Sequence, residues 1–324
     1  MRALVCKDFA PYQQLAVEDV TEPALPDGFV MLDVKAAGVN FPDILLVEGK
    51  YQMKPELPFI PGMEAAGVIS AVGAGVTDIK AGDRVIAATM LGAFAEKVPV
   101  HASQVVPMPA SMSFDEGAAL TTIYGTSWHA LKDRAKLKAG ESVLVLGAAG
   151  GVGIATVQLA KAAGARVIAA ASSDEKLAFC RENGADETIN YASEDLKARV
   201  KELTGGKGVD VVYDPVGGDL AEAALRASGW DARYLVIGFA SGPIPKIPLN
   251  LALLNSRNIL GVFWGAWAGR FPRENAGNIK EIFDMFEAGK IRPPVSASYP
   301  LAEYAKAFED LLERRVRGKV VLNP

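Results

Sequence analysis

The sequence is poor in the residues that build disulfide frameworks and metal centres. Its 324 residues include two cysteines and two histidines. Cys6 and Cys180 form no CxxC pair and are too few for a disulfide framework, which favours a reducing, cytoplasmic setting. A catalytic zinc ion needs three His, Cys or carboxylate ligands, and His101 and His129 lie far from each other and from the cysteines in the sequence. We therefore expect no metal site.

The sequence also lacks segments for nucleic acid, membranes or export. The formal net charge is -4 and no block of lysine and arginine occurs, which argues against nucleic acid and anionic membranes as partners. The N-terminal stretch "MRALVCKDF" has no apolar signal-peptide core, so we infer no export. Residues 142–160 form an uncharged run long enough to span a bilayer, but four glycines within it indicate a strand, a turn and a helix instead.

The order of the predicted elements indicates two domains. The first third of the chain consists of short apolar runs cut by glycine and proline, which is typical of β-structure. Strands and helices then alternate, and this rhythm predicts a parallel sheet covered by helices on both faces. The C-terminal tail adds two amphipathic helices and a strand, which we assign to the first domain. We therefore expect one domain from residues 1–123 and 266–324 and a second from 124–265.

The stretch "GAAGGVG", which begins at Gly147, lies between a predicted strand and a predicted helix. Gly147 permits a tight turn, and Gly150 and Gly151 leave no side chain between the backbone and a pyrophosphate. Gly153, which follows Val152, lets the helix pack closely on the strand. The free N–H groups of the helix N-terminus favour phosphate. Together these features predict a dinucleotide-binding site.

The end of the second strand of this domain favours NADPH over NADH. NAD-binding proteins place a carboxylate there to bind the ribose hydroxyls. This sequence has Ser172 and Ser173, with Lys176 one helical turn later, and these groups suit a 2′-phosphate. Asp174 is the competing candidate for an unphosphorylated ribose, although we expect it to cap the following helix. Tyr191, at the end of the third strand, is predicted to close over the phosphate.

With these motifs established, the chain resembles the zinc-free quinone oxidoreductases, the zeta-crystallin-like group of the medium-chain dehydrogenase/reductase superfamily. The resemblance runs nearly end to end and includes "AAGVNFPDILLVEGKY", "LPFIPGMEAAGVISAVGAGV", "AGDRV", "GAAGGVGIATVQLAKAAGA", "GADETINY" and "RGKVVL". It implies an α/β protein with a GroES-like, β-rich catalytic domain and an inserted Rossmann domain with a doubly wound parallel sheet. The active site would be the cleft between them. Zinc-dependent members have cysteine where this chain has Asn40 and histidine where it has Met63, so the resemblance implies chemistry without metal.

The same resemblance implies the reaction and two catalytic residues. Hydride would pass from NADPH to a quinone or an α,β-unsaturated carbonyl. Asn40 would face the nicotinamide and the substrate, and Tyr51 would line the cleft. An alternative is an enoyl-thioester reductase in which Tyr51 donates a proton, since a tyrosine is protonated at neutral pH; Tyr51 could equally be a wall of the cleft without a chemical role. A nucleotide-binding protein without catalysis is the third hypothesis.

Further candidates for the cofactor or the cleft lie at strand ends and in the tail. Thr126 and Ser127 open the crossover to the second domain and could reach the nicotinamide ribose. Phe239 ends the fifth strand, where its backbone amide or its ring could meet the nicotinamide. Phe263 and Trp264, on the last strand, could line the cleft or belong to the core. Lys319 and Arg314, in the tail, could contact the cofactor phosphates or remain solvated. The candidates are Thr126, Ser127, Phe239, Phe263 and Lys319.

The stretch "GVFWGAW" resembles the strand that pairs across the dimer axis in this family. We therefore expect a homodimer that forms through the last Rossmann strand. A buried internal strand is the alternative, and the sequence does not separate the two.

Overall fold

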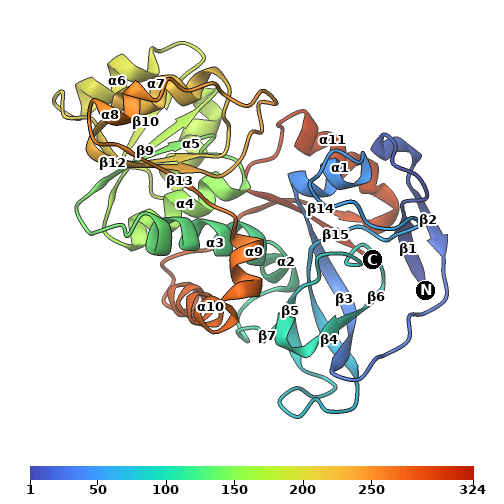
Figure 1. Cartoon of the computed structure of the whole chain (residues 1–324). Coiled ribbons are helices and arrows are strands. Elements are labelled where there is room, and N and C mark those ends of the chain that lie inside the picture. The colour runs from blue at the N-terminus through green and yellow to red at the C-terminus, as the bar shows by residue number, and fades with distance from the viewer. The chain divides into compact units, whose positions relative to one another are not determined.

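The computed structural model describes all residues from Met1 to Pro324, and they form two units (Figure 1). The split unit contains Met1–Thr122 and Pro293–Pro324, and the inserted unit contains Ile123–Arg292. The second boundary differs from the one expected near residue 265, because the helices α9 (Trp264–Arg270) and α10 (Pro272–Glu287) belong to the inserted unit. No helix is both long enough and apolar enough to cross a bilayer.

The split unit is built on a seven-stranded sheet with the order β14-β15-β3-β4-β5-β7, in which β6 also pairs with β3. A separate two-stranded sheet joins β1 and β2, and helices α1, α2 and α11 complete the unit. The strands and helices are β1 (Arg2–Val5), β2 (Ala16–Asp19), β3 (Phe29–Val39), α1 (Phe41–Val47), β4 (Glu64–Val72), β5 (Arg84–Ala88), β6 (Lys97–His101), β7 (Val105–Pro107), α2 (Phe114–Ala118), β14 (Val295–Pro300), α11 (Tyr304–Leu312) and β15 (Lys319–Asn323).

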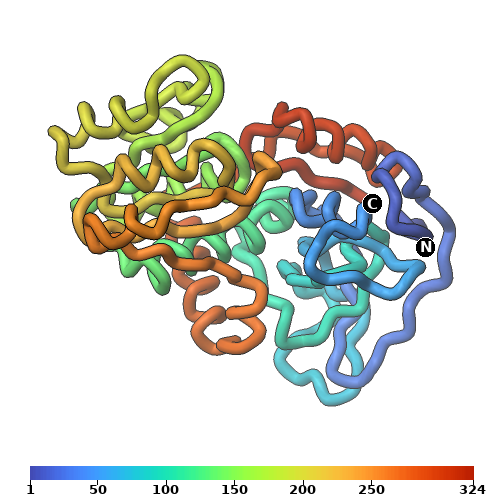
Figure 2. The backbone as a smooth tube through the Cα atoms, turned by 45° about the horizontal axis from the view of Figure 1, so that its top comes forward, coloured from blue at the N-terminus to red at the C-terminus, as the bar shows by residue number.

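Strands β14 and β15 of the C-terminal tail complete this sheet. Strand β15 pairs antiparallel with β3, and Val320 lies opposite Val39. Figure 2 shows the tail, in red, returning beside the N-terminal part of the chain, in blue. Both strands are almost entirely buried, and such near-continuous apolar runs are typical of strands covered on both faces. Their pairing places Lys319, the first residue of β15, close to Asn40, which follows β3.

The inserted unit has a six-stranded parallel sheet with the order β10-β9-β8-β11-β12-β13. Chain order therefore reverses between β8 and β11, which is the point where open α/β sheets bind ligands. Helices α6 and α7 lie on one side of the sheet, and α3 and α4 lie on the other (Figure 1). The elements are α3 (Thr121–Trp128), β8 (Ser142–Leu146), α4 (Gly151–Ala162), β9 (Arg166–Ala171), α5 (Asp174–Glu182), β10 (Glu187–Asn190), α6 (Leu196–Leu203), β11 (Val209–Asp214), α7 (Asp219–Ala227), β12 (Ser228–Val236), α8 (Asn250–Leu253), β13 (Asn258–Gly261), α9 and α10.

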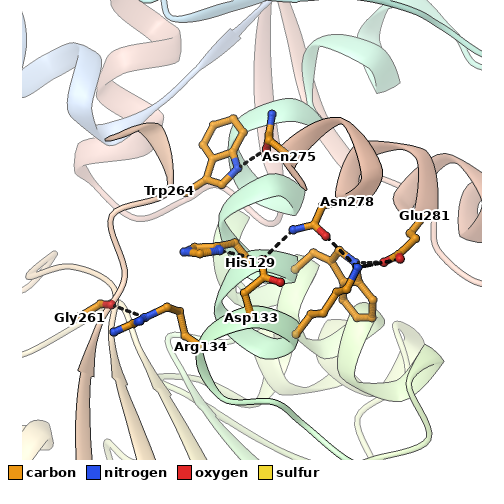
Figure 3. A network of polar contacts seen from close by, with 10 residues as sticks. His129, Asp133, Arg134, Gly261, Trp264, Asn275, Asn278 and Glu281 are labelled. Atoms are coloured by element: carbon orange, nitrogen blue, oxygen red, sulfur yellow. Dashed lines mark hydrogen bonds and ion pairs between the residues drawn. The ribbon is translucent and has the colours of Figure 1, made fainter. Parts of the chain in front are cut away.

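A π-helical segment, His129–Arg134, follows α3 and binds α10 through a network of polar contacts (Figure 3). His129 Nδ1 lies 2.8 Å from Asp133 Oδ2, and the same carboxylate oxygen accepts the Nδ2–H of Asn278 at 2.8 Å. Lys132 Nζ lies 2.7 Å from Glu281 Oε1. These contacts explain why α10 belongs to the inserted unit.

The predicted last strand ends earlier than the sequence indicated. Strand β13 stops at Gly261, Phe263 caps the next helix, and Trp264 is the first residue of α9. The indole of Trp264 packs so closely on Gly125 that a Cβ there would lie 2.6 Å from Cζ2, and its Nε1–H donates to Asn275 at 3.0 Å. The placement of Phe263 and Trp264 on a strand was therefore wrong, because contacts with distant residues turn this apolar segment into a helix.

Candidate functional site

The glycine-rich turn of the inserted unit has the geometry of a dinucleotide-binding loop. Gly147 follows β8 with a φ of 56°, which glycine adopts readily. A Cβ on Gly153 would lie 2.4 Å from the carbonyl oxygen of Gly147, so only glycine allows this contact between strand and helix. Gly150 is the N-cap of α4, and neither a capping side chain nor an acidic residue occupies the first turn. The helix N-terminus therefore suits an anionic ligand.

The ends of β9 and β10 lie side by side and bring together the residues predicted to bind a 2′-phosphate. Tyr191 N donates to the carbonyl oxygen of Ala171 at 3.1 Å, which places Tyr191 next to Ser172. Ser173 is the N-cap of α5, and its hydroxyl accepts the backbone N–H of Lys176 at 3.4 Å. The cap predicted at Asp174 was therefore one residue too late.

Asp174 is instead the first residue of α5, and its carboxylate accepts a hydrogen bond from the Asn190 side-chain amide at 2.9 Å. Its oxygen is thus held by a neighbour at the end of β10. This contact gives Asp174 a structural role, which weakens its candidacy for a ribose hydroxyl.

The loop after β11 is shaped by Asp214, which the sequence analysis did not single out. Its buried carboxylate accepts the backbone N–H groups of Val216 and Gly217, each at 2.8 Å, and the hydroxyl of Tyr234. Burial and this carboxylate raise the pKa of Tyr234. The loop lies close to the glycine-rich turn and to Phe239. A Cβ on Gly147 would lie 2.8 Å from Val216, and a Cβ on Gly217 would lie 2.8 Å from the ring of Phe239. The sequence signal is an Asp before Pro-Val-Gly-Gly at a strand end.

Ser127 and Phe263, which were predicted to lie near the nicotinamide, are not placed as expected. Ser127 is fully buried, and its hydroxyl lies 3.0 Å from both the carbonyl oxygen of Val152 and the hydroxyl of Tyr213. It therefore supports the glycine-rich turn from within the unit, and the ribose contact predicted for it was wrong. Thr126 is half-buried, and Phe263 is 64% exposed at the start of α9.

The split unit contains a buried polar cluster, which we call the Asn40 cluster and which comprises Asn40, Asp43, Glu64 and Lys319. Lys319 Nζ lies 2.7 Å from Glu64 Oε1 and also donates to Asn40 Oδ1. Asn40 Nδ2 donates to Glu64 at 2.8 Å, and the Asn40 backbone N–H donates to Asp43 Oδ2 at 2.8 Å. Both readings of Lys319, as a phosphate ligand and as a solvated side chain, were therefore wrong. Its ammonium is buried and neutralises Glu64.

Asp43 is the unusual member of the Asn40 cluster. It is fully buried, and its Oδ1 has no hydrogen-bond partner. Burial raises the pKa of Asp43 to about 7, although the Asn40 N–H and the Lys319 charge partly oppose the shift. Because such a carboxyl changes protonation near neutral pH, it can hold or release a proton under physiological conditions.

Tyr51 lies near this acid and is half-buried against the core of the split unit. Burial, and after it the charge of Asp43, raises the pKa of Tyr51. The phenol therefore stays protonated at neutral pH and can donate a hydrogen bond. Asn40 and Tyr51 were predicted from the sequence, whereas Asp43 and Glu64 were not. Asp43 had a signal, because "NFPD" places an acid at the third helical position of a capping box.

No group of three or more His, Cys, Asp or Glu side chains is arranged to hold a metal ion. His129 is a structural histidine, since it binds Asp133 and stacks on Trp267 with 4.1 Å between ring centroids. His101 accepts the N–H of Ser103 beside a short 3-10 helix.

Comparisons with known proteins identify the family. Residues 26–110 match the model of the alcohol dehydrogenase GroES-like domain, and residues 151–280 match that of the zinc-binding dehydrogenases. Quinone oxidoreductase-like protein 2 homolog of Nematostella vectensis is 40% identical over 99% of this chain and 88% of its own length. Quinone oxidoreductase of Escherichia coli, solved in complex with NADPH, is 33% identical with a TM-score of 0.92 over the whole of both chains. A mycobacterial protein solved with NADPH is likewise 33% identical, with a TM-score of 0.93 over the whole of both chains.

These similarities confirm the GroES-like and Rossmann architecture that the sequence indicated. The chain belongs to the medium-chain dehydrogenase/reductase family, among its quinone oxidoreductase-like members.

Proposed function

We propose that the protein is an NADPH-dependent oxidoreductase that reduces a quinone or an α,β-unsaturated carbonyl compound. The observation that carries this proposal is the carboxyl edge of the parallel sheet. There, the glycine-rich turn lies between β8 and α4, and Ser172, Ser173 and Lys176 follow the neighbouring strand β9. Two solved relatives, one of them a quinone oxidoreductase, hold NADPH, which supports the same cofactor here.

The residues of the inserted unit fit this dinucleotide. The N–H groups at the start of α4 would bind the pyrophosphate, and Ser172, Ser173, Lys176 and Tyr191 would bind the 2′-phosphate. Thr126, Phe239 and Phe263 are the residues that we propose for the nicotinamide half. When bound, NADPH supplies a hydride from its nicotinamide ring.

The split unit would supply the groups that act on the substrate. Negative charge develops on the acceptor oxygen during reduction, and a hydrogen-bond donor stabilises it. Tyr51, whose raised pKa keeps the phenol protonated, is the donor that we propose. Asn40 would face the substrate, and its side chain is oriented by hydrogen bonds with Glu64 and Lys319.

We propose that this reaction needs no zinc. Asn40 and Met63 stand at the positions where the resemblance places zinc ligands in metal-dependent relatives, and neither side chain is a usual zinc ligand. Elemental analysis of purified, tag-free protein should find no stoichiometric zinc, and a chelator should leave turnover intact. One zinc ion per chain, lost together with activity on chelation, would contradict the proposal.

A substrate screen tests the reaction class directly. Purified protein with NADPH is assayed against 1,2- and 1,4-naphthoquinones, simple enones and crotonyl-CoA, while the absorbance of NADPH is followed. We expect NADPH oxidation with quinones or enones, and NADH should support much less. Turnover of crotonyl-CoA alone would favour the enoyl-thioester alternative, and no NADPH oxidation with any acceptor would favour a protein without catalysis.

We also propose a homodimer that forms through β13. This strand is an edge of the six-stranded sheet, and an edge strand can pair with a second strand through its unpaired backbone groups. The Gly261 carbonyl oxygen already accepts the Nε–H of Arg134, which leaves the groups before it for such pairing. Large exposed apolar side chains gather in residues 249–263, which suits an interface. They are Leu249, Leu253, Leu254, Ile259 and Phe263.

We also propose that the protein is located in the cytoplasm, because Cys6 and Cys180 are buried thiols that form no disulfide.

A further inference from the structure

One buried side chain of the inserted unit has an unusual set of partners. Gln158 lies on α4 and is 7% exposed. Its Oε1 accepts the hydroxyl of Tyr124 at 2.6 Å and the backbone N–H of Arg292 at 2.9 Å. Its Nε2 donates to the carbonyl oxygen of Arg292 at 2.9 Å and to Asn183 Oδ1 at 2.7 Å. All four hydrogen-bonding positions of the amide are therefore used.

The positions of these partners in the chain are informative. The inserted unit begins at Ile123 and ends at Arg292, so Tyr124 is its second residue and Arg292 is its last. The chain passes between the two units at these two points alone. Gln158 therefore binds both connections to the split unit with one side chain.

Gln158 also belongs to the framework of the dinucleotide site. It stands seven residues after Gly151, the first residue of α4, which corresponds to about 10 Å along a helix. Asn183, its third partner residue, is the C-cap of α5, whose N-cap is Ser173. The two helices that begin at the proposed pyrophosphate and 2′-phosphate sites thus meet at this amide.

Movement between α4 and either connection would break these bonds, of which the one between Tyr124 and Gln158 is fully buried. Tyr124 is fully buried, and burial raises its pKa well above the ordinary value, so its hydroxyl remains a donor. A buried donor or acceptor that loses its partner is costly. The amide therefore couples the position of α4 to the directions in which both connections leave the unit.

We propose that Gln158 is a hinge clamp, a positioning residue that transmits occupancy of the dinucleotide site, by way of α4, to both connections between the units. The proposal rests on the proposed function in one respect, since NADPH is the ligand that occupies the site. The clamp aligns the units for hydride transfer, and it contributes no contact to the cofactor.

Hydrogen–deuterium exchange of the full-length protein, read by mass spectrometry, tests the clamp. Gln158→Met keeps the length and burial of the side chain and removes all four hydrogen bonds. Tyr124→Phe removes one bond. The control is Ser228→Ala, which deletes another buried hydroxyl of the inserted unit. This hydroxyl donates to the carbonyl oxygen of Leu225 at 2.7 Å, accepts the Nε–H of Arg257 at 2.9 Å and touches neither connection.

Without ligand, Gln158→Met should raise exchange by about tenfold in residues 121–128 and 288–296 and leave β12 unchanged. Tyr124→Phe should act mainly on the first connection, and Ser228→Ala on neither. With NADPH, the wild type should become protected at the glycine-rich turn and at both connections. Gln158→Met should protect the turn alone, with an NADPH Kd within about threefold of the wild type and a kcat lowered by about tenfold at unchanged quinone KM.

Each outcome decides a separate point. If the connections of Gln158→Met respond to NADPH as those of the wild type do, the clamp is wrong. If the wild type does not bind NADPH, the proposed function fails, and the ligand-free exchange still decides on the clamp: unchanged connections overturn it. If Gln158→Met does not fold, Tyr124→Phe supports the clamp by faster exchange at the first connection and overturns it by exchange equal to that of Ser228→Ala.

Discussion

At the scale of single residues, Lys176 is the sharpest test of cofactor preference. Lys176→Ala removes the positive charge that we propose for the 2′-phosphate. NADPH binding should weaken by about 1–3 kcal/mol, the scale of a charge-assisted hydrogen bond, and NADH binding should barely change. Fluorescence titration of both cofactors measures this. The exposed Lys207, outside the site, supplies Lys207→Ala as a control for net charge. Equal weakening of NADPH and NADH by Lys176→Ala would contradict the phosphate contact.

Tyr51 separates the two enzyme hypotheses. Tyr51→Phe keeps the ring that packs on the split-unit core and removes the hydroxyl. A quinone reductase should lose less than about tenfold in kcat/KM, or roughly 1.4 kcal/mol, because hydroquinone oxygens can take protons from solvent. An enoyl-thioester reductase needs a proton at carbon, and loss of a dedicated acid costs ~10²–10⁴-fold. NADPH titration of the variant is the control, because a misplaced nicotinamide would mimic a lost acid.

Asp43 should make stability depend on pH with a sign opposite to that of an ordinary ion-paired carboxylate. Burial raises its pKa from 3.8 to about 7, so between these values the folded protein holds a proton that the unfolded chain releases. The stabilising contribution is full below the unfolded pKa and is lost as pH rises through the folded pKa. Relative to Asp43→Asn, the wild type should therefore lose stability from pH 4 to 8. Urea unfolding at several pH values measures this, and parallel curves for both proteins would contradict it.

The Asn40 cluster shows where single residues escape prediction. Asn40 and Lys319 are 279 positions apart, and Glu64 reaches them from β4. No local pattern pairs these residues, and a lysine near the C-terminus is usually solvated. Only the antiparallel pairing of β15 with β3 brings the ammonium of Lys319 against the buried carboxylate of Glu64. The capping-box pattern indicates that Asp43 binds the Asn40 backbone, but the burial of Asp43 depends on the tertiary fold.

At the scale of elements, two glycines on helices should respond with opposite signs to the same change. Gly125→Ala, in α3, would place a Cβ 2.6 Å from Trp264, and such overpacking costs about 1–3 kcal/mol. Gly277→Ala, in α10, meets nothing within 4 Å and should stabilise by about 0.5–1 kcal/mol through helix propensity. Thermal or urea unfolding of both variants measures this. A stabilised Gly125→Ala variant would contradict the packing of α9 on α3.

The glycine-rich turn was predictable because local chemistry determines it. The spacing of Gly147, Gly150 and Gly153 is required by a positive φ, a bare helix N-cap and a close contact between strand and helix. The start of α9 could not be predicted from the sequence, because "ILGVFWG" is a continuous apolar run that is typical of a buried strand. Its helical form depends on contacts between Trp264 and Gly125 and between Trp267 and His129. Propensity yields to tertiary packing in such segments.

At the scale of the whole molecule, the insertion of one unit into the other reduces their covalent link to two connections. The proposed chemistry needs NADPH from the inserted unit and Tyr51 from the split unit. Their alignment therefore depends on those connections, and Gln158 is the one side chain that bonds to Tyr124 and to both backbone groups of Arg292. Rate and cofactor affinity can then change independently, because a residue can act on alignment without touching the cofactor.

The proposed dimer gives the last prediction. An exposed edge strand joins a second copy through its unpaired backbone groups, and a charged side chain in that strand opposes such pairing. Ile259, in β13, is 41% exposed, and Leu312, on α11 of the split unit, has the same exposure. Ile259→Lys should therefore raise the dimer dissociation constant at least tenfold, or about 1.4 kcal/mol, and Leu312→Lys should leave it unchanged. Sedimentation velocity over a range of micromolar concentrations measures both. A wild type that stays monomeric throughout, or a dimer that Leu312→Lys weakens as much as Ile259→Lys does, would place the interface elsewhere or remove it.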